Sequence, residues 1–100
     1  KNGDKFGEAS LHRRVPGGAS GHETDKISPS SPKGVHLLAE GLNPDKGGGH
    51  LIVYKSASGG EVFSASSITW PSSILIDEQV SRITANVLRR FLAPGPAPGV

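Results

Sequence analysis

The apolar residues in the last third of the chain recur every three or four positions, which is the period of one face of an α-helix. These residues are Val80, Ile83, Val87, Leu88 and Phe91. Asp77 precedes them as a favourable N-cap residue, and Arg89 and Arg90 fall in the last turn, where the helix dipole favours cations. The pattern predicts one amphipathic helix over residues 78–92.

Shorter apolar runs before the helix have the length and the β-branched content of strands. They are Gly34–Ala39 (GVHLLA), His50–Lys55 (HLIVYK) and Glu61–Ser66 (EVFSAS). The near-continuous apolar character of the first run predicts a buried strand, and the intervening segment Ser56–Gly60 predicts a hairpin between the other two. Because a residue before proline is pushed toward extended geometry, we expect Trp70, which precedes Pro71, to be extended and to end the strands.

The strand, turn and helix over residues 61–92 form the unit around which we expect the rest to be organised. The predicted fold class is α/β, with about three strands, one β-hairpin and one closing C-terminal helix. Upstream, Pro16–Pro32 predicts a loop whose length is uncommon unless it is functional or packed on something else. Gly41–Gly49 predicts a second loop, Leu11–Val15 favours a strand edge or one helical turn, and residues 94–100 predict a disordered tail.

The composition excludes several classes of function. A net charge of +2, carried by scattered basic residues with few aromatic neighbours, argues against a nucleic-acid partner. The absence of cysteine excludes disulfides, thiolate metal sites and a cysteine nucleophile. No apolar run approaches the roughly 18 residues of a membrane span, so we expect no membrane partner and a cytoplasmic location. The chain also lacks methionine, from which we expect Lys1 to be an internal position of a longer protein.

The loop Gly17–Asp25 (GGASGHETD) is the first candidate site because it gathers an imidazole and two carboxylates. His22, Glu23 and Asp25 are weak candidates for ligands of a divalent metal or for an acid/base pair. No motif with metal-ligand spacing accompanies them. We therefore favour a structural interpretation, in which the glycines let the backbone turn and the carboxylates cap loop amides.

Other candidates carry less chemistry. Gly47–His50 has the glycines of an anion cradle but lacks the Lys-Ser/Thr of a P-loop, which favours a flexible start to a strand. Ser20 fails the spacing of a nucleophile elbow because Gly21 follows it directly. The hydroxyl-rich run Ser66–Trp70 either lines a pocket at a strand end or, as we favour, lets the tryptophan fill the gap between sheet and helix.

The two remaining histidines in these segments stand alone. His36 lies in an apolar strand, where a histidine is more often a satisfied structural residue than a ligand, and His12 has an unremarkable context. Neither enters the candidate site. The sequence therefore predicts no metal ligand and no cofactor-binding residue within this chain.

Several stretches resemble the C-terminal region of the N,N-dimethylformamidase large (beta) subunit family, over about residues 6–93. The most specific are GGASGHETD, GGEVFSASSITW and VSRITANVLRRFL, which are landmarks of a fold rather than catalytic signatures. The resemblance implies that residues 1–93 are an incomplete part of a class I glutamine amidotransferase-like domain with flavodoxin-like layers. Full-length members of the family are much longer.

The resemblance also implies an activity, which is hydrolysis of the formamide C–N bond by a mononuclear iron held by Tyr, His and Glu. Those ligands lie in a part of the large subunit that is absent here, so no ligand is transferred to this chain. Glutaminase chemistry would need a cysteine nucleophile, which this chain lacks.

Two functions follow as hypotheses. In the first, the chain is the C-terminal segment of an amide hydrolase and has a structural or subunit-contacting role, with the rest of its parent chain and either a small subunit or a second copy as partners. In the second, it is a non-catalytic amidotransferase-like module that binds a sugar or a protein through the Gly17–Asp25 loop.

Overall fold

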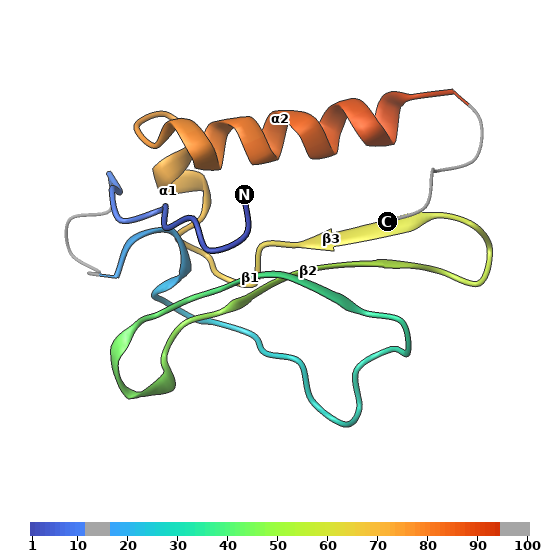
Figure 1. The fold of residues 1–100 in the computed structure, drawn as a ribbon, viewed down its shortest axis with the longest axis horizontal. Coiled ribbons are helices and arrows are strands. Elements are labelled where there is room, and N and C mark those ends of the chain that lie inside the picture. The colour runs from blue at the N-terminus through green and yellow to red at the C-terminus, as the bar shows by residue number, and fades with distance from the viewer. Residues whose placement is uncertain (12–16, 95–100) are drawn as a thin grey trace.

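A computed structural model describes residues 1–11 and 17–94 of the chain. A single antiparallel sheet of three strands has the order β1-β2-β3, and a long helix covers one of its faces (Figure 1). The strands are β1 (His36–Glu40), β2 (His50–Lys55) and β3 (Glu61–Ser64), and the helices are α1 (Pro71–Ile74) and α2 (Glu78–Leu92). Short 3-10 turns lie at Gly18–Ser20 and Pro44–Lys46. The predicted fold class is confirmed, with its strands, hairpin and closing helix.

Some expectations fall on residues outside the described part. Of the Leu11–Val15 segment, only Leu11 lies within the described part, and His12 lies outside it. Of the predicted tail over residues 94–100, only the first residue is described.

The hairpin between β2 and β3 forms where its turn residues predicted it. Ile52 pairs with Ser64 and Lys55 with Glu61, and the amide of Ser56 donates to the carbonyl of Gly60 at 2.8 Å. Gly59 takes a φ of 94°, the left-handed conformation that such a loop requires. The second strand was expected to continue to Ser66. It ends at Ser64 instead, because Ser66 has a φ of 58° and turns the backbone out of the sheet.

The expectation that the first strand is buried is wrong. β1 begins at His36 and pairs with β2 alone among the described residues, so that it forms an edge of the sheet. The side chains of Leu37 and Leu38 are 48% and 52% exposed, and only Ala39 packs against the core. An apolar run predicts that its side chains contact other apolar groups. Among the described residues, only Ala39 of β1 has such a contact with the core.

The helix α2 begins and ends at the predicted residues. Asp77 accepts a hydrogen bond from the amide of Val80 at 3.0 Å and thereby caps the helix. Val80 is fully buried, and Ile83 packs against the same core cluster. The apolar stripe loses its cover toward the C-terminal end, where Leu88 and Phe91 are exposed.

The core is centred on Trp70, which lies between the sheet and α2. Its ring meets that of Phe63 edge-on, with 6.4 Å between centroids, and its indole nitrogen donates to Oγ1 of Thr84 at 3.0 Å. Ala19, Leu51 and Val80 complete the buried cluster. The interpretation of Trp70 as filling the gap between sheet and helix is confirmed.

The expected extended geometry of Trp70 is wrong. Its φ of −53° and ψ of −49° are helical, and it forms the N-cap of α1, an element that the sequence analysis did not predict. Pro71 tolerates this arrangement because the first turn of a helix needs no amide hydrogen at that position. Burial of the indole ring and its hydrogen bond to Thr84 outweigh the preference of a residue before proline for extended geometry.

Candidate functional site

The Gly17–Asp25 loop is held by its own backbone. The amide of Gly49 donates to the carbonyl of Ser20 at 3.1 Å, the amide of Asp25 donates to the carbonyl of Ser66 at 3.0 Å, and the carbonyl of Asp25 accepts from the amide of His50 at 2.9 Å. The loop therefore joins the loop before β2 to the segment after β3. This long loop is packed on the rest of the molecule, as one of its two expected explanations required.

Glycine is needed in this region because backbone touches backbone. A Cβ on Gly18 would lie 2.1 Å from the carbonyl oxygen of Gly7, and one on Gly48 would lie 2.3 Å from that of Gly41. The amides of Gly47 and Gly49 donate to the carbonyls of Pro44 and Ser20. The Gly47–Gly49 run therefore leads into β2 through close packing, and those two amides are not available to cradle an anion.

The three weak candidates of the loop take different positions. His22 is half-buried, and its carbonyl accepts from the hydroxyl of Ser67 at 2.8 Å. Glu23 is exposed with a φ of 46°, and Asp25 is exposed. Within the described residues no group of three or more His, Cys, Asp or Glu side chains could hold a metal ion. Neither carboxylate caps an amide in that part of the chain, so the backbone performs the role that we expected of the side chains.

Ser20 has a structural partner. Its hydroxyl donates to Oδ1 of Asn43 at 2.9 Å, while the side-chain Nδ2 of Asn43 donates to the carbonyl of Gly17 at 2.8 Å. Asn43 thus ties the start of the candidate loop to the loop before β2. His36, the lone histidine of the first strand, is exposed at the sheet edge.

A shallow groove lies on the face of the sheet opposite α2, where residues of the loop before β1 cover part of the strands. Its volume is about 170 Å³, below the roughly 300 Å³ at which small-molecule pockets usually begin. The side chains that define it are Ile27, Pro32 and Val35 from the loop and His50, Ile52 and Tyr54 from β2.

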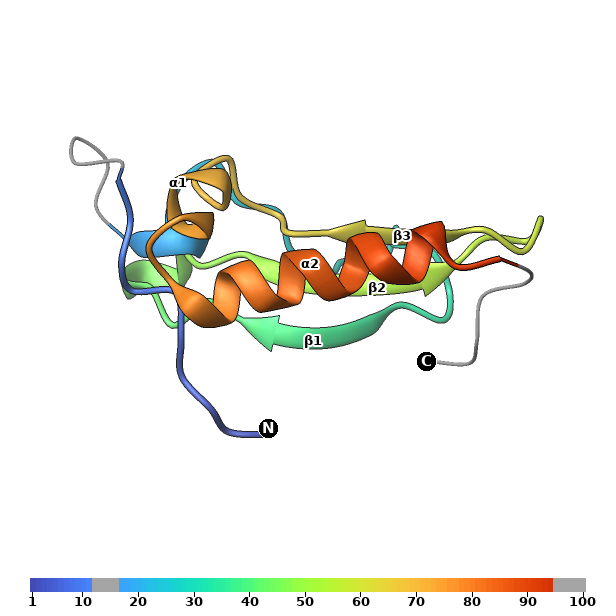
Figure 2. The same cartoon turned by 90° about the horizontal axis from the view of Figure 1, so that it is seen from above.

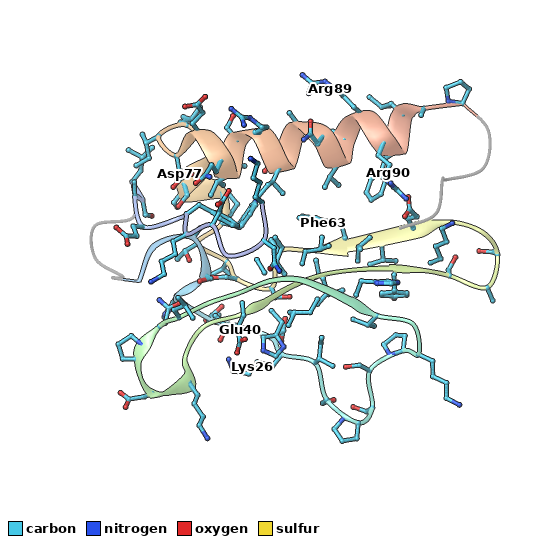
Figure 3. All side chains as sticks on the ribbon, viewed as in Figure 1. Lys26, Glu40, Phe63, Asp77, Arg89 and Arg90 are labelled. Atoms are coloured by element: carbon cyan, nitrogen blue, oxygen red, sulfur yellow. The ribbon has the colours of Figure 1, made fainter. Side chains whose placement is uncertain are left out.

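His50 is the polar centre of this groove, and the sequence analysis had considered it for chemistry only as the last residue of the Gly47–His50 candidate. Its Nδ1 accepts a hydrogen bond from the amide of Ile27 at 2.9 Å, and its Nε2 lies 3.7 Å from Oε1 of Glu40. Lys26 donates to the carbonyl of Gly48 beside it. Figure 3 places Lys26 and Glu40 on this face. The polar groups are engaged in holding the loop to the sheet, and the only sequence signal was a histidine at a strand start.

A partly buried ion pair fixes the other end of α2. The side chain of Glu61, at the start of β3, is 1% exposed and accepts from two nitrogens of Arg90, with Nη2 at 2.9 Å from Oε2. The hydrogen bond from Arg90 lowers the pKa of Glu61 below its ordinary value, although burial opposes this effect. Figure 3 shows Arg90 pointing from α2 toward the sheet. Sequence reasoning had explained Arg90 by the helix dipole alone.

The exposed apolar side chains are the feature of the surface that most strongly indicates a partner. They occur on β1, on the C-terminal half of α2 and in the turn between α1 and α2. Exposed apolar residues in groups usually mark contact with another protein surface. The members in these three places are Leu37, Leu38, Leu75, Ile76, Leu88, Phe91 and Leu92, while Leu11, Ile27, Leu42, Val62 and Ile68 are exposed elsewhere.

Comparisons with known proteins agree on one family. Residues 1–82 match the family described as N,N-dimethylformamidase beta subunit-like, C-terminal. The N,N-dimethylformamidase beta subunit of Paracoccus aminophilus is 34% identical over 123 residues, which cover 95% of this chain and 16% of that protein. The beta subunit of the same name from Alcaligenes sp. is 32% identical over 125 residues, which cover 97% of this chain and 16% of that protein.

The chain therefore spans about a sixth of the length of these relatives. No solved structure matches it. In the described part of the chain, no helix has the length and apolar character that crossing a bilayer demands.

Proposed function

This chain belongs to the N,N-dimethylformamidase beta subunit-like C-terminal family, and from that premise we propose that it is the C-terminal segment of the large subunit of an amide hydrolase. The bond cleaved would be an amide C–N bond, as the names of the relatives indicate. Within that enzyme we propose a structural, subunit-contacting role for this segment. The amidotransferase-like domain over residues 1–93 and the cytoplasmic location belong to the same proposal and rest on the family resemblance.

The observation that carries the structural role is the use of the candidate loop. Ser20 and Asp25 engage their backbone in holding three segments together, and the hydroxyl of Ser20 is bonded to Asn43. The side chains of Glu23 and Asp25 remain exposed to solvent. A catalytic acid or base is usually tuned by burial or by a neighbouring charge.

The iron that the family resemblance implies does not fit the described residues of this chain. One imidazole and one carboxylate, those of His50 and Glu40, lie close to each other. His50 already uses its Nδ1 to accept a hydrogen bond from the amide of Ile27. Two such groups fall short of the three protein ligands implied. No step of the reaction is therefore assigned to residues of this segment.

Hydrolysis of N,N-dimethylformamide by the full-length protein tests the proposal, together with its iron content. We expect formate release by the unchanged protein, and we expect Glu23→Ala and Asp25→Ala to leave its rate within about twofold, because surface substitutions outside a site change little. A full-length protein that releases no formate would contradict the hydrolase assignment. A large loss of rate in either variant, with the fold intact, would contradict the structural role.

One observation favours a second function, a non-catalytic module that binds a sugar or a protein through the Gly17–Asp25 loop. Glu23 holds a left-handed backbone conformation while its side chain remains exposed. Such strain is more common at binding loops than elsewhere. If this function is the right one, Glu23→Gly would keep the fold and Glu23→Ala would weaken capture of the ligand, with no effect on formate release.

A further inference from the structure

The open edge of β1 is apolar at its centre. Edge strands that end a sheet usually carry a lysine or a proline, which discourages further pairing. Here the central residues Leu37, Leu38 and Ala39 are all apolar, and a shift of register between Leu37 and Ala39 is the one protective irregularity. The backbone groups on the outer side of β1 have no strand partner among the described residues.

The helix α2 has exposed apolar side chains that point toward the β1 side of the sheet. Arg90 reaches Glu61 on β3, which fixes the rotation of the helix. Leu88 lies two positions earlier, about 200° around the helix axis, so that it points away from β3. Phe91 follows Arg90 by one position, about 100° in the opposite sense of rotation, which places it about 60° from Leu88 around the axis. Leu88 and Phe91 are 56% and 47% exposed.

The strand order makes the side opposite β3 the side of β1. Figure 2 shows α2 crossing the sheet obliquely, with its C-terminal end above β3 and its N-terminal part nearer to the side of β1. The outer edge of β1 and the exposed side of α2, defined by Leu37, Leu38, Leu88 and Phe91, are here called the open side. A strand added to β1 would extend the sheet on the side toward which Leu88 and Phe91 face.

We propose that the open side docks a further β-strand that comes from the preceding part of the same large-subunit polypeptide. This inference rests on the proposed function, since it requires the longer chain. The relatives supply the length, because this stretch covers only 16% of each of them. The added strand pairs its backbone with β1 and turns alternate apolar side chains toward the helix face of the sheet, on the side where Leu88 and Phe91 are exposed.

Connection within one chain fits this surface better than a second copy does. β1 spans His36–Glu40, and a strand of that size is about 17 Å long. A stable interface between separate molecules usually buries about 800 Å² on each partner, which is more than a short edge and two helix side chains supply. A segment on the same chain loses far less translational freedom when it docks.

Photo-crosslinking in the full-length protein tests the occupant directly. A photoreactive phenylalanine analogue is placed at position 38, at position 88, or at position 75 as a control, where Leu75 is 83% exposed but lies in the turn between α1 and α2. We expect positions 38 and 88 to crosslink to one peptide from the preceding part of the same chain, and position 75 not to reach that peptide. Crosslinks to a second copy or to another protein, or no crosslinks from positions 38 and 88, would overturn the proposal.

A charged substitution at the open side provides a second test of the docked strand. In the full-length protein, Leu38→Asp buries an unpaired carboxylate against the added strand, so we expect amide exchange in β1 to rise about tenfold or more. Leu75→Asp should leave that exchange unchanged. Equal exchange in both variants would refute docking, and the crosslinking experiment decides the matter if Leu38→Asp does not fold. A protein that crosslinks as expected but releases no formate would keep this inference and remove the proposed activity.

Discussion

Arg90, in the last turn of α2, donates hydrogen bonds to both carboxylate oxygens of Glu61, which is the first residue of β3. This bidentate contact ties the C-terminal end of the helix to the sheet at a point far from the Trp70 core. Bidentate arginine–carboxylate pairs have a fixed geometry and shield each other from solvent. The contact therefore sets how α2 is rotated over the strands, and with it which apolar side chains remain uncovered.

The Glu61–Arg90 pair predicts a pH dependence of stability. The hydrogen bond from Arg90 lowers the pKa of Glu61 in the folded state from an ordinary value of 4.5. A depressed carboxyl pKa stabilises the fold above the unfolded pKa, and this stabilisation is lost as the pH falls through the folded pKa. We expect Glu61→Gln to lower the urea midpoint at neutral pH, and we expect the gap to the unchanged chain to close in the acid range below 4.5. A gap that is the same at both pH values would contradict the pairing.

Asp77 predicts two separable effects at the start of α2. Its Oδ1 accepts from the amide of Val80 at 3.0 Å, and its Oδ2 accepts from the amide of Gly7 at 2.7 Å. Asp77→Ala removes both and should cost about 2 kcal/mol or more of unfolding free energy, beyond the roughly 1 kcal/mol of a typical N-cap. Asp77→Asn keeps one acceptor for the cap and should recover about half of the loss. Urea unfolding measures both, and equal losses in the two variants would argue against the bond to Gly7.

The contact between Trp70 and Thr84 predicts a loss that depends on one hydroxyl group. Thr84→Val keeps the shape of the side chain but removes the acceptor of the buried indole N–H, which should cost about 1–3 kcal/mol. Thr84→Ser retains the hydroxyl and should cost less. Because the chain has a single tryptophan, its fluorescence reports on unfolding and on the polarity around this ring. Similar stability of the two variants would mean that the hydrogen bond contributes little.

Substitutions at Gly3 and Gly18 distinguish the cost of backbone strain from the cost of a steric clash. Gly18 and Gly3 both have positive φ, at 67° and 89°, but a Cβ on Gly18 would meet Gly7 at 2.1 Å while one on Gly3 would meet nothing within 4 Å. Gly3→Ala should cost about 1 kcal/mol from strain alone. Gly18→Ala should cost about 3 kcal/mol or more, since the clash with backbone adds to the strain. Thermal unfolding of both variants checks this, and equal losses would contradict the close approach of the two segments.

Local signals were sufficient for the elements that later carry the fold. The spacing of Val80, Ile83 and Val87 and the cap residue Asp77 fixed α2 to its first and last residue. The glycine-ended Ser56–Gly60 segment fixed the hairpin. These predictions succeed because a helix cap and a short turn depend on residues a few positions apart.

The candidate loop could be located from the sequence, but its role could not. Its glycines are required by backbone contacts with Gly7 and with the loop before β2, which are distant in sequence. Nothing in the spacing of His22, Glu23 and Asp25 says whether their side chains converge. The groove around His50 was equally invisible, because the amide of Ile27 that engages it lies in a separate loop.

By itself the sequence determined where α2 begins and ends, where the hairpin turns, the α/β class, and the resemblance to one family, because each depends on neighbouring residues or on their order. Only the tertiary structure decided that Trp70 enters a helical turn, that Ser66 ends β3 and that β1 lies at an open edge. In each case a contact between distant parts of the chain, or the lack of one among the described residues, outweighed a local preference. Burial depends on what packs against a residue, and a pattern of apolar letters cannot specify that neighbour.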